Sequence, residues 1–346
     1  MKRFILVLCV VLVAFGGYRL LSFKTDVPSG ISMTNDAENL DAFAAELHPL
    51  TIESLRNGKY PGSDLVIEET LANGSNYKRY IVSYQSEGNK NFALLTVPMA
   101  PMPVEGYPAI VFNHGYIPPK EYRTTERYIA YVDGFARNGY IVLRPDYRGH
   151  GNSEGIASGA YGSNDYTIDV LNAVSSLKKR GDVNVDKIGM WGHSMGGFIT
   201  LRVMVTIPDV KAGVIWGGVV GSYDDLLNNW RRRQANITPF PSQSQSRSWR
   251  QRMSDEFGTP EKNPQFWDSI SATSFLTDIS GPLEIHHSDT DETVPVLFSR
   301  KLQERMQSAG KESALFEYKG DDHNIAANFS LAMNRSIAFF DKHLKP

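Results

Sequence analysis

The sequence predicts an α/β fold with a mostly parallel, doubly wound sheet that begins with antiparallel strands. From residue 109 onward, strand-like and helix-like segments alternate, and such alternation is typical of a parallel sheet. A Gly-His-Ser-Met-Gly turn at residues 192–196 lies between an apolar strand and an apolar helix. Two segments that combine histidine with aspartate, residues 287–292 and 321–323, follow late strands of the predicted sheet.

The chain begins with the basic residues Lys2 and Arg3, which precede an uninterrupted apolar run from Phe4 to Tyr18. A bilayer-spanning helix needs about 20 apolar residues, so this run is short for one. Residues 1–24 therefore suit either a cleaved signal peptide or an uncleaved membrane anchor. Since the basic start stays in the cytoplasm in both cases, we expect the rest of the protein to be exported. It would then be secreted, or held at the membrane by the apolar run.

Residues 25–46 are polar and rich in serine, asparagine and aspartate, and we expect a linker with one short helix near residues 40–47. The folded domain is predicted to occupy residues 47–346. It opens with three strand signals separated by turn residues, a pattern that indicates an antiparallel meander. These strands are expected at residues 65–69, 77–84 and 92–97.

The alternating part of the chain supplies the parallel strands and the helices that cover them. Apolar residues at helical spacing predict a helix over residues 166–179, and Gly139 ends the helix before it. Strands are expected at residues 109–113, 140–144, 187–191, 212–216, 283–287 and 314–318, and further helices at 128–137, 198–204, 298–308 and 329–344.

Residues 223–277 interrupt the alternation, and we interpret them as a helical lid inserted over the functional edge of the sheet. The alternative is a solvated surface excursion, above all for the part rich in serine and glutamine. The segment carries a cluster of arginines, which form either a solvated face or a site that attracts an anionic substrate or lipid headgroups. These arginines are Arg231, Arg232, Arg233, Arg250 and Arg252.

The composition excludes several classes of function. A net charge of −2 over 346 residues, 41% of them hydrophobic, argues against a nucleic-acid partner. The only cysteine, Cys9, lies in the apolar N-terminal run. The folded domain therefore has neither a disulfide framework nor a cysteine nucleophile.

The turn at residues 192–196 has the G-x-S-x-G pattern of a nucleophile elbow, in which a serine stands on a strained turn between strand and helix. Gly192 and Gly196 remove side chains that would collide there, so Ser194 is the predicted nucleophile. A serine hydroxyl needs a histidine base, and that base needs a carboxylate to fix its tautomer. The pattern belongs to the α/β-hydrolase fold, in which the chain order is serine, acid, histidine.

His323, in a glycine-containing loop after the last strand, is the predicted base. His286 and His287 end an earlier strand, and His343 lies near the end of the final helix, where the helix dipole favours a cation. The loop after the preceding strand offers three acids, Asp289, Asp291 and Glu292.

Residues 287–295, His-Ser-Asp-Thr-Asp-Glu-Thr-Val-Pro, resemble the H-G-x-x-D-x-x-V-P loop of prolyl-oligopeptidase-like and dienelactone-hydrolase-like α/β-hydrolases. This resemblance implies that Asp291 is the triad acid, with Ser288 in place of the glycine, and leaves Asp289 as the alternative. Residues 146–153, Asp-Tyr-Arg-Gly-His-Gly-Asn-Ser, match the D-x-R-G-x-G-x-S loop of the same superfamily, where the loop is mainly architectural. We therefore assign no catalytic role to His150.

An oxyanion hole needs two backbone N–H groups directed at the developing negative oxygen. Met195 follows the nucleophile at the start of a helix, where free amides and the helix dipole favour an anion. His114-Gly115, after the strand at residues 109–113, resembles the oxyanion loop of the family, so the Tyr116 N–H is the second candidate. The alternative for His114-Gly115 is a tight turn at a strand end.

These residues predict a serine hydrolase that forms an acyl-enzyme and needs no cofactor. The expected substrate is a small or medium carboxylic ester, and a short peptide is the alternative. The short N-terminal strands do not match the β-propeller that filters peptides in prolyl oligopeptidases, so a specialised oligopeptidase is disfavoured. A non-catalytic, hydrolase-like binding protein is a third hypothesis, against which an intact triad argues.

No metal site is expected. The adjacent histidines His286 and His287 must point to opposite faces of their strand, and the sequence has neither an H-E-x-x-H motif nor paired cysteines. Substrate-binding residues and the oligomeric state carry no signal in the sequence.

Overall fold

The computed structural model describes residues 47–230 and 248–345. Residues 47–346 form one compact unit. The expected leader, the linker and the three consecutive arginines at residues 231–233 lie outside the described residues. Within the described ranges, no helix combines the length and the apolar character that crossing a membrane requires.

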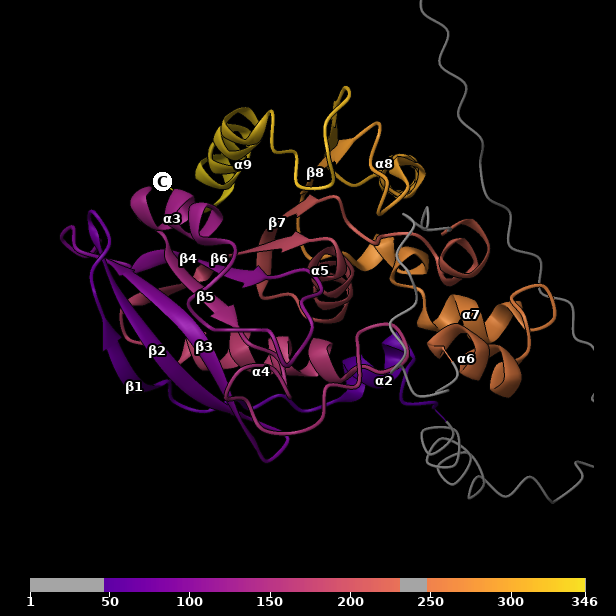
Figure 1. The fold of residues 1–346 in the computed structure, drawn as a ribbon, viewed down its shortest axis with the longest axis horizontal. Helices are drawn as coiled ribbons and strands as arrows, with labels where there is room; N and C mark the ends of the chain where they lie inside the picture. Colours follow the sequence, from indigo (N-terminus) through magenta and orange to yellow (C-terminus); the bar gives the residue numbers. More distant parts are fainter. Residues whose placement is uncertain (1–46, 231–247, 346) are drawn as a thin grey trace, which may run out of the picture. The chain divides into compact units, whose positions relative to one another are not determined.

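Nine strands in the described part of the chain form a single sheet in the order β1-β2-β3-β5-β4-β6-β7-β8-β9 (Figure 1). The first three strands pair antiparallel, which confirms the expected meander. Glu87 and Gly88, with φ of 48° and 80°, form the tight turn between the second and third. The three strands are β1 (Val66–Leu71), β2 (Tyr77–Ser86) and β3 (Asn89–Pro98).

The remaining six strands pair parallel with one another, as predicted, and β3 joins them antiparallel through β5. Because β4 lies between β5 and β6, the connection from β4 to β5 runs across the sheet in one direction, and the connection from β5 to β6 runs back in the other. The loops that follow strands at such a switch point form a crevice at the carboxyl edge of the sheet. The six strands are β4 (Tyr107–Asn113), β5 (Ile141–Pro145), β6 (Val183–His193), β7 (Val210–Trp216), β8 (Leu283–Ser288) and β9 (Ser313–Tyr318).

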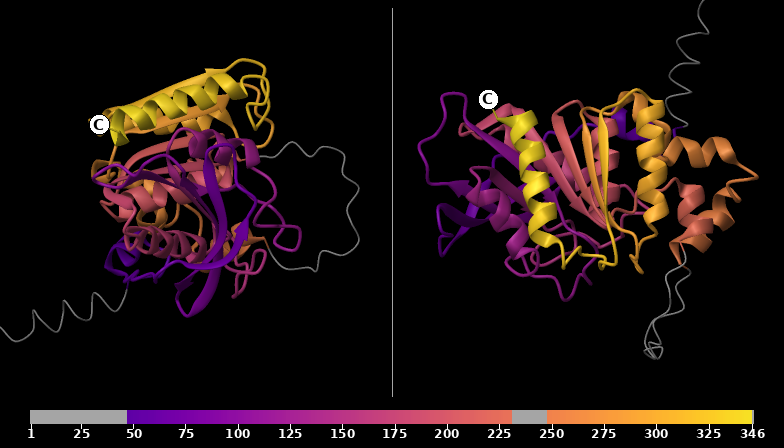
Figure 2. Two further views of the ribbon diagram at one scale, coloured as in Figure 1. Left: turned by 90° about the vertical axis from the view of Figure 1, so that its left-hand side faces the viewer. Right: turned by 90° about the horizontal axis from the view of Figure 1, so that it is seen from above.

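Helices cover both faces of the sheet, each over its own apolar cluster. One face carries α3 (Ile129–Arg137) and α9 (Phe329–Leu344), and the other carries α2 (Ile52–Asn57), α4 (Asp165–Lys178), α5 (Met195–Thr206) and α8 (Val296–Ser308) (Figure 2). The two faces make this a doubly wound α/β-hydrolase fold, as the sequence predicts. Helix α2 was not predicted. It is a short helix capped by the Thr51 hydroxyl, which accepts the Ser54 N–H at 3.0 Å.

The described parts of the inserted segment, residues 223–230 and 248–277, are largely helical. They contain a five-residue π-turn (Asp225–Asn229), α6 (Trp249–Phe257), α7 (Pro264–Ile270) and two short 3₁₀ turns (Ala272–Ser274 and Leu276–Asp278). The buried Arg202 of α5 binds α7 to the start of the domain. The Arg202 guanidinium donates to the Ile270 carbonyl at 2.5 Å and to the Leu50 carbonyl at 2.8 Å.

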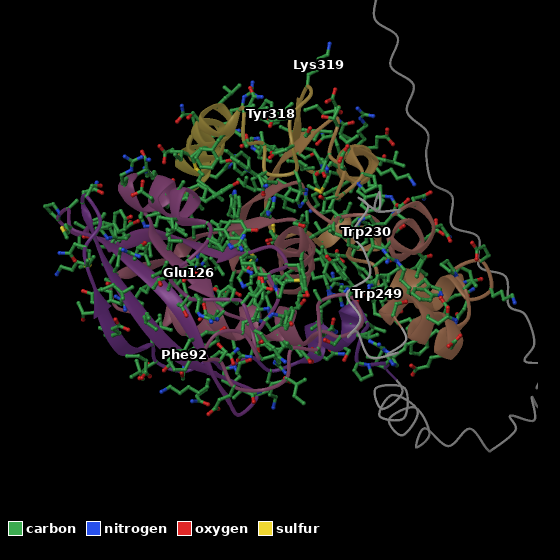
Figure 3. All side chains as sticks on the ribbon, viewed as in Figure 1. Phe92, Glu126, Trp230, Trp249, Tyr318 and Lys319 are labelled. Atoms are coloured by element: carbon green, nitrogen blue, oxygen red, sulfur yellow. The ribbon has the colours of Figure 1, made fainter. Side chains whose placement is uncertain are left out.

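Arg250, one of the lid arginines, is packed rather than free. Its guanidinium carbon lies 5.0 Å from the ring centres of both Trp230 and Trp249, and its Nε donates to the Leu226 carbonyl at 3.0 Å. Figure 3 shows both tryptophans on the side of the molecule formed by α6 and α7. This arginine therefore contributes to the packing of the lid.

The loop at residues 146–153 has an architectural role. The fully buried Asp169 carboxylate of α4 accepts the Arg148 guanidinium at 2.7 Å and the Ser86 hydroxyl at 2.7 Å. Asp146 accepts hydrogen bonds from Tyr122 and Thr124, and burial raises its pKa to about 6. These bonds join the loop after β5 to β2, to α4 and to the loop after β4.

Candidate active site

Ser194 occupies the turn between β6 and α5 with φ 54° and ψ −117°. A positive φ is strained for a residue that has a Cβ. Glycines on both sides permit the turn: a Cβ on Gly192 would overlap the Gly196 carbonyl, and one on Gly196 would overlap the Asn113 carbonyl. The turn thus raises the serine above the sheet edge, at the start of a helix.

His323 lies in the loop after β9, and its Nδ1 is 2.6 Å from Oδ2 of Asp291, in the loop after β8. The Asp291 side chain is 0% exposed and that of His323 is 16% exposed. His323 and Ser194 line the same cavity of about 530 Å³, together with Gly115 and Tyr116. The fold therefore gathers the predicted nucleophile, base, acid and oxyanion loop at one place.

Asp291 is held as an anion by several donors. The N–H groups of Thr293 and Val294 donate to its Oδ1 at 2.8 and 3.0 Å, and His287 Nε2 lies 3.2 Å from its Oδ2. Burial raises the pKa of Asp291, but the hydrogen bonds from His287, His323 and Val294 outweigh burial and hold that pKa well below its usual range. An ionised carboxylate in this position keeps a proton on His323 Nδ1 and leaves Nε2 to accept one.

His287 is a partner of the acid that the sequence did not mark. Its Nδ1 lies 2.7 Å from the Ser299 hydroxyl, and its Nε2 lies 3.0 Å from the Val294 carbonyl. Since a carbonyl only accepts, Nε2 carries the proton and can donate to Asp291 as well. Its neighbour His286 faces the other side of the sheet, where it contacts Ser336 of α9.

The loops after β8 and β9 are tied to each other. The Ser288 and Thr290 hydroxyls donate to the Asp321 carbonyl at 2.5 and 2.8 Å, and the Gly320 N–H donates to Asp289 at 2.7 Å. Asp289, the alternative acid, is exposed, and its carboxylate binds the backbone of the neighbouring loop rather than His323. These bonds fix the distance between the acid and the base.

The oxyanion loop runs close to the nucleophile: a Cβ on Gly115 would stand 3.2 Å from the Ser194 Cβ. The Gly115 N–H itself donates to the Tyr128 hydroxyl at 2.9 Å. The Tyr116 N–H is therefore the next amide of this loop that can serve an oxyanion. Met195 begins α5, so its N–H has no carbonyl one turn earlier in the helix and is free for the same purpose.

A chain of hydrogen bonds connects this loop to His193, the residue before Ser194, and to the backbone of His323. The Tyr128 hydroxyl is 2.7 Å from His193 Nδ1, and His193 Nε2 is 3.1 Å from the His323 carbonyl. Burial, followed by charge repulsion from His323, lowers the pKa of His193 to about 3, so its ring is neutral. Nε2 must donate to the carbonyl, so Nδ1 accepts from Tyr128, which in turn accepts from Gly115.

Comparison with known proteins shows the family of this chain. The model of the prolyl oligopeptidase family matches residues 127–346. The chain belongs to the prolyl oligopeptidase family. It is a serine hydrolase, and both peptidases and esterases occur among the proteins it resembles.

Three relatives illustrate that range. The uncharacterized peptidase YtmA of Bacillus subtilis is 24% identical over 246 residues, which are 70% of this chain and 85% of YtmA. The acylaminoacyl peptidase of Pyrococcus horikoshii matches with a TM-score of 0.59 and 19% identity over 79% of this chain but only 42% of its own. Acetyl xylan esterase 1 of Thermoanaerobacterium sp. JW/SL YS485 matches with a TM-score of 0.58 and 16% identity over 85% of this chain and 91% of its own.

The chain spans less than half of several longer relatives: 42% of the Pyrococcus peptidase structure and 36% of a second Bacillus subtilis peptidase, YuxL, to which it is 29% identical. At these identities, the solved structures establish the fold that the chain shares with them.

Replacing Tyr128 with phenylalanine removes the hydroxyl that joins Gly115 to His193. We expect kcat to fall about tenfold or more with little change in KM. The hydroxyl makes two hydrogen bonds that contribute about 1 kcal/mol each, and their loss would displace the loop at Gly115. Tyr131→Phe is the matched control, since that hydroxyl lines the same cavity but donates to the Asn324 carbonyl at 3.2 Å. Equal effects of both variants on kcat would contradict a positioning role for Tyr128.

Proposed function

We propose that this serine hydrolase cleaves small or medium carboxylic esters by means of Ser194, His323 and Asp291. The observation that carries the proposal is the fully buried Asp291 carboxylate 2.6 Å from His323, whose ring lines one cavity with Ser194. A serine in such an arrangement has the base that it needs, and the base has the orienting anion.

The proposed reaction uses these groups in turn. His323 Nε2 takes the Ser194 proton as the serine oxygen bonds to the ester carbonyl carbon, and Asp291 stabilises the imidazolium. The negative oxygen accepts the N–H groups of Met195 and Tyr116. His323 then gives the proton to the departing alkoxide, which leaves an acyl-enzyme. Water repeats the sequence and releases the acid, so no cofactor is required.

The size of the cavity favours a small substrate. Its volume of about 530 Å³ falls within the range of about 300–1,000 Å³ that is usual for small-molecule sites. Resonance stabilises an ester less than a peptide bond, so ester cleavage demands less of the binding site. Short peptides are the second candidate, because the family description and YtmA both name peptidases.

Turnover of 4-nitrophenyl butyrate against aminoacyl 4-nitroanilides tests the proposal. We expect the full chain to hydrolyse the ester with the larger kcat/KM and Ser194→Ala to lose at least about 10³-fold. Ser176→Ala is a control, since that buried serine accepts the Ser63 N–H and does not line the cavity. Larger kcat/KM values for the anilides would make the enzyme a peptidase, and failure of a fluorophosphonate to label Ser194 would favour a non-catalytic protein.

We also propose that the enzyme acts outside the cytoplasm, with residues 1–24 as signal peptide or anchor. The support is the basic pair Lys2 and Arg3 before the apolar run Phe4–Tyr18. Cells that make the full chain should carry labelled Ser194 in the medium or in the membrane fraction, open to added protease. A chain without residues 2–24 should remain in the cytosol. Cytosolic recovery of the full chain would refute the proposal.

A further inference from the structure

We infer that Arg127 forms an anion-binding subsite in the catalytic cavity, so that the enzyme prefers esters that bear a negative charge. This inference rests on the proposed esterase function and adds a substrate class to it: esters with a carboxylate in the acyl part or in the alcohol part. The sequence offered such a role for the lid arginines only as an alternative to a solvated face, and it gave no signal at Arg127.

The position of Arg127 is the first support. The residue lines the cavity that contains Ser194 and His323, and it is exposed to solvent there. Across residues 47–230 and 248–345, no hydrogen bond or ion pair engages its guanidinium. Glu292, the acid in the same lining, already has an interaction partner. Arg127 is thus a cation that a bound substrate can reach without displacing a protein partner.

The backbone of Arg127 is the second support. Arg127 and Tyr128 have φ of 55° and 50°, in the left-handed region that side chains other than glycine rarely adopt. Two such residues in succession persist only where the surroundings fix them, and strain of this kind collects at functional sites. Tyr128 already serves the oxyanion loop, and the adjacent Arg127 is directed by the same strained turn.

The surroundings that fix this turn are identifiable. The guanidinium of Arg144, a residue that is 1% exposed, donates to the Arg127 carbonyl at 2.7 Å, to the Glu126 carbonyl at 3.2 Å and to the Thr124 carbonyl. Glu126 marks this turn in Figure 3. A buried arginine therefore fixes the backbone of the segment that carries Arg127 beside the cavity.

The chemistry of the guanidinium gives the ligand class. Arginine remains charged at every physiological pH and presents a planar fork that matches a carboxylate with two parallel hydrogen bonds. Of the lid arginines that the structure describes, Arg250 is occupied by two tryptophans and the Leu226 carbonyl.

Two pairs of esters that differ in charge test the subsite. The acyl pair is 4-nitrophenyl hemisuccinate and 4-nitrophenyl butyrate; the alcohol pair is 4-acetoxybenzoate and its neutral methyl ester. For at least one pair, the ratio of kcat/KM, anionic over neutral, should fall about tenfold in Arg127→Gln and further in Arg127→Glu. Added salt should lower that ratio in the unaltered enzyme.

Arg137→Gln is the matched control. Arg137 lies at the end of α3, with its side chain 56% exposed, and pairs with Asp133 at 2.9 Å. Its ratios should equal those of the unaltered enzyme. Labelling of Ser194 by a fluorophosphonate shows that each variant is folded.

The possible results separate the two proposals. If both ratios stay unchanged in Arg127→Gln and Arg127→Glu while Ser194 is labelled and esters are hydrolysed, the subsite is refuted and the esterase function stands. If the unaltered enzyme hydrolyses none of the four esters, the esterase function fails first, and the substrate class fails with it.

Discussion

The contact between His323 and the buried carboxylate of Asp291 is the interaction on which the rest of the site depends. Moving a charged group out of water costs several kcal/mol of free energy unless hydrogen bonds and an opposite charge replace the lost water. Here the replacements are the amides of Thr293 and Val294 and the ring of His287. They keep the acid ionised before any substrate arrives, so the base is oriented in the resting enzyme.

The sheet explains why these groups meet. Parallel pairing of β8 with β9 brings the loops that follow them to the same edge, beside the turn after β6. Bonds from Ser288 and Thr290 to the Asp321 carbonyl join the two loops directly. Ser194, Arg127 and Tyr128, which lie at the same edge, have strained backbone conformations. The free-energy cost of this strain is offset by the packing of the regular strands and helices.

The features that the sequence predicted are those that a short, continuous segment of the chain encodes. The elbow around Ser194 and the loop around Asp291 are local patterns, and the strands and helices follow from apolar periodicity, so these were predictable. Helix α2 has six residues, too few for a helical period to show. Strand β6 starts at Val183, four residues before its predicted start, because the polar residues there conceal the strand pattern.

The residues that support the proposed triad were missed for a different reason. Tyr128 and His193 are separated by 65 residues, and His193 and His323 by 130. Such partners come together only through the order of the strands, which no single segment encodes. His287 was noticed as a strand end, but its contact with Asp291 depends on the path of the loop between them. Arg127 carries no motif, and its location in the cavity emerges only from the fold.

The rate at which a fluorophosphonate labels Ser194 in Asp291→Asn and in Asp289→Asn tests the central claim most directly. The two aspartates lie in the same loop, but only Asp291 contacts His323, whereas Asp289 accepts the Gly320 N–H. The account predicts labelling slower by about 10³-fold or more in Asp291→Asn, where the histidine loses its tautomer, and nearly unchanged in Asp289→Asn. Rapid labelling of Asp291→Asn, or a larger loss in Asp289→Asn, would contradict it.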